Sequence, residues 1–155
     1  MEEKRFLLPF THGVDTKALH NVLQLARTHH ATVVALALIP LAEQQRVEDA
    51  RLEHIQQAKD FLATLQTQGE IHHVPVEEHE RYTYDVLESI ISIAQEMRCQ
   101  RILLAYEGEE VRFLQPNEAQ QLRIRKPYLL SILYTPAKKK TGRSLFRPAI
   151  PQLAR

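Results

Sequence analysis

Short apolar runs alternate along this chain with longer segments whose apolar residues recur at helical spacing. The clearest strand candidates are residues 5–10 (RFLLPF), 32–39 (TVVALALI), 101–106 (RILLAY) and 128–134 (YLLSILY). The second of these runs is apolar at nearly every position, which is typical of a strand that is buried on both faces. Such a strand needs helices above and below it, and the crossover connections of a parallel sheet supply them.

The segments between these runs have the periodicity of amphipathic helices. In the first of them, Asp15 or Thr16 is positioned to cap a helix that continues to Arg27 and has one apolar face for the core. We expect further helices at residues 46–68, 82–98 and 116–126. Gly69 is expected to end the second helix, and Pro127 is expected to end the last one.

The third strand is the weakest of the predicted elements. Residues 71–76 (IHHVPV) are few, and they include Pro75, which cannot donate a hydrogen bond to a neighbouring strand. We therefore expect this strand at an edge of the sheet.

The alternation of strands and helices predicts an open, doubly wound α/β sheet with short connections and right-handed crossovers. In such a sheet, ligands bind beyond the carboxyl ends of the strands, near the point where the strand order reverses. The two loops expected at that point are residues 11–15 and residues 107–115.

The length and composition are those of one globular domain, with 155 residues of which 44% are hydrophobic and 25% are charged. We expect a single domain over residues 1–136, followed by a basic, mobile tail over residues 137–155. The basic residues of the tail are Lys138, Lys139, Lys140, Arg143, Arg147 and Arg155, and the tail has no acidic residue. Residues 1–136 therefore hold 14 of the 20 basic residues and all 19 acidic ones, a net charge of −5.

The single cysteine and the apolar runs bear on the cellular compartment. Cys99 has no partner for an intramolecular disulfide, and one thiol cannot form a cysteine-based zinc site. The apolar run at residues 6–10 is too short for the core of a signal peptide, and the run at residues 33–42 is about half of the ~20 residues that cross a bilayer. We therefore expect a cytoplasmic protein that does not span a membrane.

Several segments match the pattern of a known family in their order and spacing. They are Leu7-Leu8-Pro9-Phe10, the run at residues 33–38, the RILLAY strand with Gly108 after it, and the final apolar strand. Over residues 4–135 this pattern resembles the universal stress protein family. The resemblance implies a Rossmann-like, parallel, five-stranded sheet in strand order 3-2-1-4-5 with helices on both faces, and a regulatory or stress-response role without enzymatic activity.

The resemblance also implies a homodimer. Members of the family often pair their last strand across a two-fold axis, and an apolar edge strand with aromatic ends is a liability unless it is covered. The residues that would form this interface are Tyr128, Leu130, Ile132 and Tyr134.

The nucleotide-binding members of the family have a glycine-rich loop after the fourth strand, in which glycines allow the backbone to approach the phosphates. Gly108 matches the first glycine of that loop. Val111, Gln121 and Leu122 stand at the later glycine and hydroxyl positions, and Thr11 stands where the first strand of the family ends in an acid.

The charges around Gly108 also disfavour a phosphate. Glu107, Glu109 and Glu110 surround it, and Arg112 could offset one of these charges. We therefore expect no cofactor, with ATP and AMP disfavoured.

A second hypothesis keeps the same cleft for a divergent nucleotide or another small ligand. The candidate binding residues of this cleft are Thr11, His12, Asp15, Gly108 and Arg112. His12, Asp15 and Arg112 are the ones that would recognise such a ligand, although a histidine in a loop is more often a plain surface residue.

Sequence signatures of catalysis and metal binding are missing. The chain contains no G-x-S-x-G elbow, Walker loop or G-x-G-x-x-G fingerprint, and no acid is paired with a nucleophile. The histidine pairs His29-His30 and His72-His73 are adjacent in sequence, so a strand would point the two rings of a pair to opposite faces. We predict neither an enzyme nor a metal site.

A third hypothesis assigns polyanion binding to the tail. Lys138, Lys139, Lys140 and Arg143 could contact the phosphates of nucleic acid or of anionic lipid. A tail that only solubilises the acidic domain is the simpler interpretation.

Overall fold

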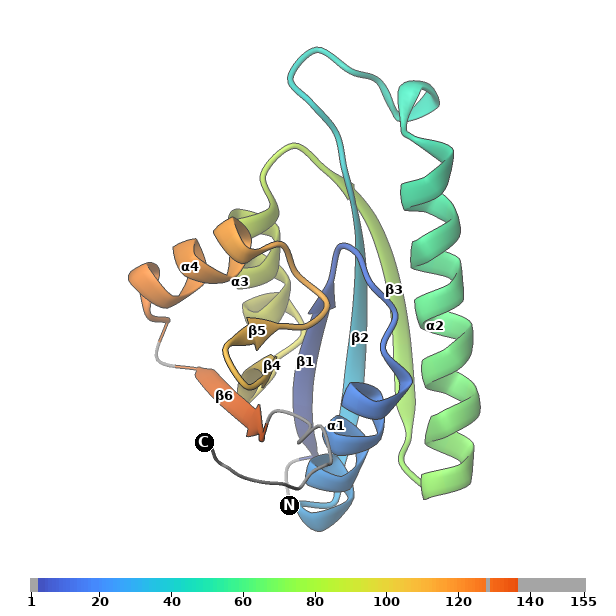
Figure 1. The fold of residues 1–155 in the computed structure, drawn as a ribbon, viewed down its shortest axis with the longest axis vertical. Helices are drawn as coiled ribbons and strands as arrows, with labels where there is room; N and C mark the ends of the chain where they lie inside the picture. Colours follow the sequence, from blue (N-terminus) through green and yellow to red (C-terminus); the bar gives the residue numbers. More distant parts are fainter. Residues whose placement is uncertain (1–2, 128, 137–155) are drawn as a thin grey trace, which may run out of the picture.

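The computed structural model describes residues 3–127 and 129–136 of the chain and shows a central sheet between two layers of helices (Figure 1). The elements are β1 (Lys4–Phe10), α1 (Thr16–Thr28), β2 (Ala31–Pro40), the short 3₁₀ turn η1 (Val47–Asp49), α2 (Leu52–His72), β3 (Val76–Thr83), α3 (Val86–Glu96), β4 (Arg101–Glu107), β5 (Glu110–Val111), α4 (Pro116–Arg125) and β6 (Leu130–Thr135).

The strand order confirms the predicted topology. The parallel strands follow one another as β3-β2-β1-β4-β6, which is the expected order 3-2-1-4-5 with β6 as the fifth predicted strand. The prediction of a wholly parallel sheet needs one correction, because the two-residue strand β5 pairs antiparallel with β4. β5 lies beside the carboxyl end of β4, where the strand order reverses.

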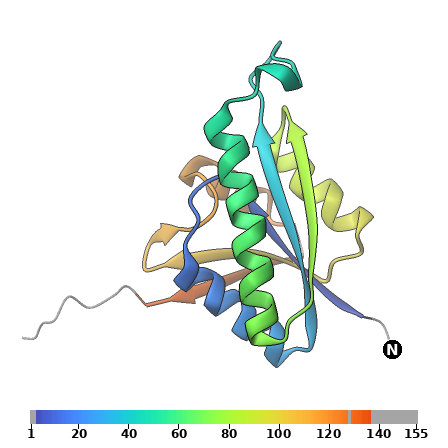
Figure 2. The same cartoon turned by 90° about the vertical axis from the view of Figure 1, so that its right-hand side faces the viewer.

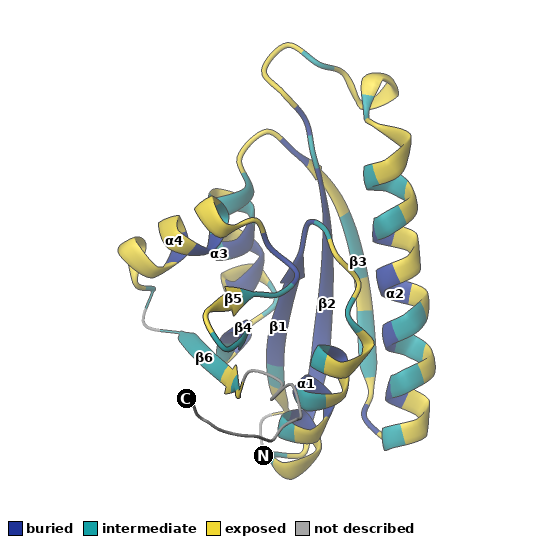
Figure 3. Cartoon of the chain, in the orientation of Figure 1, coloured by how far each residue is buried: buried dark blue, intermediate teal, exposed yellow. Residues whose placement is uncertain are grey.

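Each face of the sheet has its own hydrophobic layer because side chains alternate along every strand. On one face, the residues of β1 and β2 pack against α1 and α2, with Phe10 and Phe61 stacked at 4.2 Å between ring centroids. On the other face, Leu7 and Leu36 pack against α3 and α4. Figure 2 shows α2 crossing in front of β2 and β3, with α3 and α4 behind the sheet. Figure 3 shows that β1 and β2 are buried along most of their lengths.

The second helix begins and ends later than its sequence periodicity predicts. The predicted start near residue 46 is wrong, because the side chain of Asp49 accepts a hydrogen bond from the amide of Arg46 (3.1 Å) and stabilises the separate turn η1. The predicted end at Gly69 is also wrong. The helix continues to His72 and ends where His73 adopts a left-handed conformation (φ 59°).

Gly69 lies inside α2 because a side chain there has no room. A Cβ atom at this position would stand 2.6 Å from Val76 Cγ2 and 2.9 Å from the carbonyl oxygen of Val74. The glycine therefore allows the end of α2 to pack closely on the chain that leads into β3.

The later start of β3 corrects the predicted strand at residues 71–76. Its first two residues belong to α2, and the strand itself is Val76–Thr83 (VEEHERYT). The predicted edge position is confirmed, since β3 is the terminal strand of the sheet beside β2. Its many charged side chains suit an exposed edge, because they disfavour pairing with another chain.

The remaining helices differ from the predictions mainly at their ends. Asp15 caps α1 by accepting a hydrogen bond from the amide of Ala18 (3.1 Å), as predicted. Helix α3 is shorter than the predicted residues 82–98, because Asp85 caps it through the amide of Glu88 (3.1 Å) and β3 continues to Thr83. Within the described part of the chain, no helix has both the length and the apolar character of a membrane span.

We predict that Gly69→Ala destabilises the fold by about 1–2 kcal/mol, because the new methyl group must displace Val76 and a backbone carbonyl while gaining only helix propensity. Urea unfolding followed by circular dichroism measures the change. Thr67→Ala, at an exposed position of the same helix, is the matched control and should stay within about 0.5 kcal/mol of the wild type. An equally stable Gly69→Ala variant would show that the close approach is not a packing constraint.

Candidate functional site

The candidate site lies where β1 and β4 separate. The two strands are paired at Phe6 with Arg101 and at Leu7 with Ile102. Beyond these pairs they diverge, and their carboxyl ends at Phe10 and Glu107 lead into the two predicted ligand loops. This is the position at which a doubly wound sheet forms its ligand crevice.

A β-hairpin fills the gap between the diverging strands. β4 turns at Gly108 and Glu109, and β5 returns along it with Glu110 opposite Glu107. Gly108 has a positive φ of 60°, which a two-residue hairpin turn favours and which glycine adopts without strain. The amide of Arg112 then donates to the carbonyl oxygen of Ala105 (2.8 Å) and extends the pairing.

Phe113 connects this hairpin to the end of β1. Its carbonyl oxygen accepts hydrogen bonds from the amides of Thr11 (2.7 Å) and His12 (3.2 Å). Its buried ring packs near Phe10 and Phe61, with centroid distances of 6.3 and 6.0 Å. The backbone of Phe113 is left-handed (φ 77°), a strained conformation for a bulky residue that costs about 1–3 kcal/mol. Burial of the ring, at about 1.5–3 kcal/mol, offsets this strain.

Several backbone amides of the two ligand loops are already hydrogen-bonded. Besides Thr11 and His12, the amide of Gly13 donates to Gln57 Oε1 (2.8 Å) and the amide of Gly108 donates to the carbonyl oxygen of Thr135 (2.8 Å). A phosphate bound by the backbone requires free amides that converge on it. These four amides would have to lose their present partners first.

Arg112 is surrounded by carboxylates of its own chain. Its Nη2 lies 2.7 Å from Glu107 Oε1, its Nη1 lies 3.2 Å from Glu110 Oε1, and its Nε lies 2.9 Å from Asp15 Oδ2. The contact with Asp15 is an ion pair whose angle is not that of a hydrogen bond. The pKa of Arg112 is raised above its ordinary value, mainly because the guanidinium donates to Glu107.

A carboxylate also occupies the start of α4. Glu118 Oε1 accepts hydrogen bonds from the Thr11 hydroxyl (2.7 Å) and from the amide of Gln115 (2.8 Å). The N-terminus of a helix attracts negative charge, and here Glu118 supplies it in the position where a ligand anion would bind. Sequence reasoning missed Glu118, although its spacing from Gln115 is that of a capping box. It also missed Phe113, for which no sequence signal exists.

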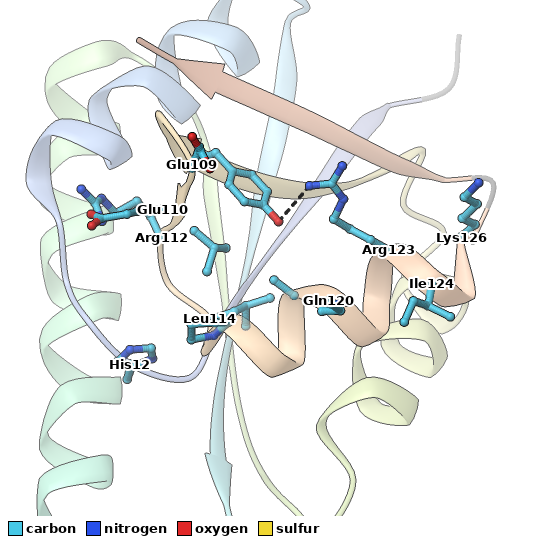
Figure 4. Close-up of a pocket in the computed structure, with 13 residues that line it drawn as sticks. His12, Glu109, Glu110, Arg112, Leu114, Gln120, Arg123, Ile124 and Lys126 are labelled. Atoms are coloured by element: carbon cyan, nitrogen blue, oxygen red, sulfur yellow. Dashed lines mark hydrogen bonds and ion pairs between the residues drawn. The ribbon is translucent and has the colours of Figure 1, made fainter. Parts of the chain in front are cut away.

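A pocket of about 850 Å³ opens on the other side of the hairpin, between β5 and α4 (Figure 4). Its lining residues are His12, Tyr106, Glu109, Glu110, Val111, Arg112, Leu114, Pro116, Ala119, Gln120, Arg123, Ile124 and Lys126. The Nδ1 atom of His12 is buried and has no hydrogen-bond partner among residues 3–127 and 129–136.

The five candidate residues from the sequence are therefore only partly brought together. His12 and Arg112 line the pocket, and Asp15 contacts Arg112. The buried Thr11 hydroxyl faces Glu118, and Gly108 lies in the hairpin turn beside Thr135. Among the residues that the structure describes, no group of three or more His, Cys, Asp or Glu side chains is arranged to hold a metal ion.

Neither a protein-family model nor a curated protein matches this chain, but solved structures do. A structure from the universal stress protein family of Burkholderia pseudomallei superposes with a TM-score of 0.62 at 18% identity, covering 86% of this chain and 96% of the other. The universal stress protein of Archaeoglobus fulgidus in complex with dAMP gives a TM-score of 0.61 at 15% identity, covering 86% and 98%.

A third solved structure, a universal stress protein in complex with cAMP, gives a TM-score of 0.53 at 10% identity and covers 87% of this chain and 97% of the other. At these low identities the likeness establishes the fold and leaves the ligand open. The chain therefore has the universal stress protein fold.

We predict that Arg112→Gln destabilises the protein by about 1–2 kcal/mol, between the values for exposed and buried ion pairs, because three carboxylates lose their shared cation. Urea unfolding at low and at 0.5 M added salt measures the loss, which should shrink as salt screens the remaining like charges.

The matched control for Arg112→Gln is Arg125→Gln, which removes an exposed pair with Glu88 (3.2 Å) and should change stability by less than about 0.5 kcal/mol. If the two variants were equally stable, Arg112 would not be held mainly by its own chain and would be available to a ligand.

Proposed function

We propose that this chain is a cytoplasmic regulatory module of the universal stress protein type that is not an enzyme and does not bind ATP through the family's loop. The observation that carries the proposal is the pair of hydrogen bonds from Thr11 and His12 to the Phe113 carbonyl. This contact joins the two loops that would have to separate around a nucleotide. The shared fold supports the family part of the proposal.

The electrostatics of the crevice support the absence of ATP binding. The solved structures with dAMP and cAMP show that proteins of this fold hold adenine nucleotides. In this chain Arg112 pairs with Asp15, Glu107 and Glu110, and Lys17 also pairs with Glu107 (3.8 Å). A triphosphate would therefore meet an excess of negative charge with few donors to balance it.

The one thiol of the chain also supports a role without catalysis. Cys99 is buried, and burial raises the pKa of its thiol to about 11. The thiol therefore stays protonated near neutral pH and is a poor nucleophile.

We predict that isothermal titration with ATP or AMP in the presence of Mg²⁺ detects no saturable binding tighter than a Kd of about 1 mM. The Archaeoglobus fulgidus protein titrated with dAMP is the positive control for the method. Micromolar ATP binding that Thr11→Ala or Gly108→Ala abolishes would contradict the proposal. Binding that survives both substitutions would instead support a divergent site elsewhere in the fold.

A divergent small-ligand site is the second candidate function, and the pocket beside α4 favours it. Its volume of about 850 Å³ lies in the range of natural ligand sites. Polyanion binding through residues 137–155 stays a prediction from the sequence, because the tail lies outside the described residues.

The proposed module forms a homodimer through its last strand. β6 pairs with β4, and its residues are half-buried or exposed. The amides of Ile102 and Gly108 donate to the carbonyls of Leu129 and Thr135, so the alternating backbone groups of Ile132 and Tyr134 point away from β4. These outward groups are suited to pairing with a second copy. Tyr128 of the predicted interface lies outside the described residues.

We predict that Tyr134→Pro weakens dimerisation about tenfold or more, because proline removes an outward N–H that would be used twice across a two-fold axis. Tyr134→Thr, which loses the same half-exposed ring but keeps the N–H, is the matched control. Sedimentation equilibrium measures both variants. A monomeric wild type, or equal dimerisation of the two variants, would disprove the strand-paired dimer.

A further inference from the structure

The pocket beside α4 shares His12 and Arg112 with the crevice of the fold but extends away from it along α4. The crevice residues Thr11, Asp15 and Phe113 do not line it. The apolar part of the pocket comes from both walls, with Val111 on the hairpin side and Leu114 on the side of α4. An occupant of this pocket therefore does not need to open the contact at Phe113.

Two cations at one end of the pocket have no acidic partner within the described part of the chain. Arg123 lies over the ring of Tyr106, with 5.5 Å from the guanidinium carbon to the ring centroid, and donates to the tyrosine hydroxyl at 3.3 Å. Neither Arg123 nor Lys126 forms an ion pair with any residue of 3–127 or 129–136. Figure 4 shows both side chains at the end of the pocket opposite Glu109 and Glu110.

The other end of the pocket limits how much negative charge an occupant can carry. Glu109 and Glu110 would repel a second anionic group, and Arg112 is already shared among carboxylates. Beside Arg123 and Lys126, Ile124 exposes 72% of its surface, an apolar side chain that an occupant could cover. Charge and shape thus favour an apolar body with one anion at the end of Arg123 and Lys126.

From this arrangement we infer that the pocket binds a small amphipathic acid, with a flat apolar or aromatic body against Tyr106, Leu114 and Ile124 and a carboxylate at Arg123 and Lys126. The guanidinium of Arg123 presents forked donors that match a carboxylate. The inference goes beyond the proposed regulatory role and does not depend on the lack of ATP binding.

The test uses 2-naphthoate as the probe and 2-naphthylmethanol, which has the same body without the charge, as the control ligand. Both are titrated into the full ¹⁵N-labelled chain, and amide shifts in two-dimensional NMR give the site and the affinity. We expect saturable shifts of the amides of Val111, Gln120 and Ile124, with binding of the alcohol about tenfold weaker. Equal affinity for both ligands, shifts elsewhere in the chain, or no saturable binding of the acid would overturn the inference.

Variants on α4 separate the pocket from the rest of the helix. The double variant Arg123→Gln, Lys126→Gln should weaken 2-naphthoate binding about tenfold, and Gln120→Trp should prevent it by filling the pocket from an exposed position. Arg125→Gln, on the same helix but outside the pocket, should bind like the wild type. Circular dichroism checks that each variant is folded. Unchanged binding by the double variant or by Gln120→Trp would overturn the assignment.

The ATP test uses substitutions at Thr11 and Gly108, and neither residue lines the pocket. The two proposals can therefore fail independently of each other. A crevice that binds ATP leaves the naphthoate result unaffected, and a pocket without affinity for naphthoate leaves the ATP result unaffected.

Discussion

The carbonyl oxygen of Phe113 sets the architecture of the whole site. By accepting the amides of Thr11 and His12, it joins the end of β1 to the segment that follows β5, at the point where β1 and β4 would otherwise part. The hairpin, the buried ring of Phe113 and its strained left-handed backbone are all consistent with this one contact. The two loops that border the crevice are thus joined by a contact of the chain with itself.

Polar and charged groups around this contact are also paired within the chain. A phosphate site needs free amides and unpaired cations, whereas here Glu118 caps the start of α4 and three carboxylates form ion pairs with Arg112. Intramolecular partners thus occupy several of the donors that a phosphate would need. The fold and the ligand are therefore separable properties, because the fold depends on the apolar alternation of the strands while the ligand depends on a few polar groups at their ends.

The sequence predicted the features of the fold that local patterns determine. Strand β2 is apolar because both of its faces are buried, and the capping role of Asp15 follows from its position before an apolar stripe. The end of α2 could not be predicted, because Gly69 is required by Val74 and Val76, which approach it only in the folded chain. The sequence identified the two site loops and the acidic surround of Gly108. It could not identify Phe113 as the residue that closes the crevice, because a positive φ at phenylalanine arises from tertiary packing.

The hairpin that leads to Phe113 also forms one side of the pocket beside α4. Because β5 pairs back along β4, its residues face α4 across a space that an open loop would not form. The charges of the chain are distributed accordingly. Arg112 pairs with three carboxylates, while Arg123 and Lys126, on the helix side of the pocket, form no ion pair with a described residue. A mutation that opened the hairpin would therefore affect both places at once, because the same strand closes the crevice and forms a wall of the pocket.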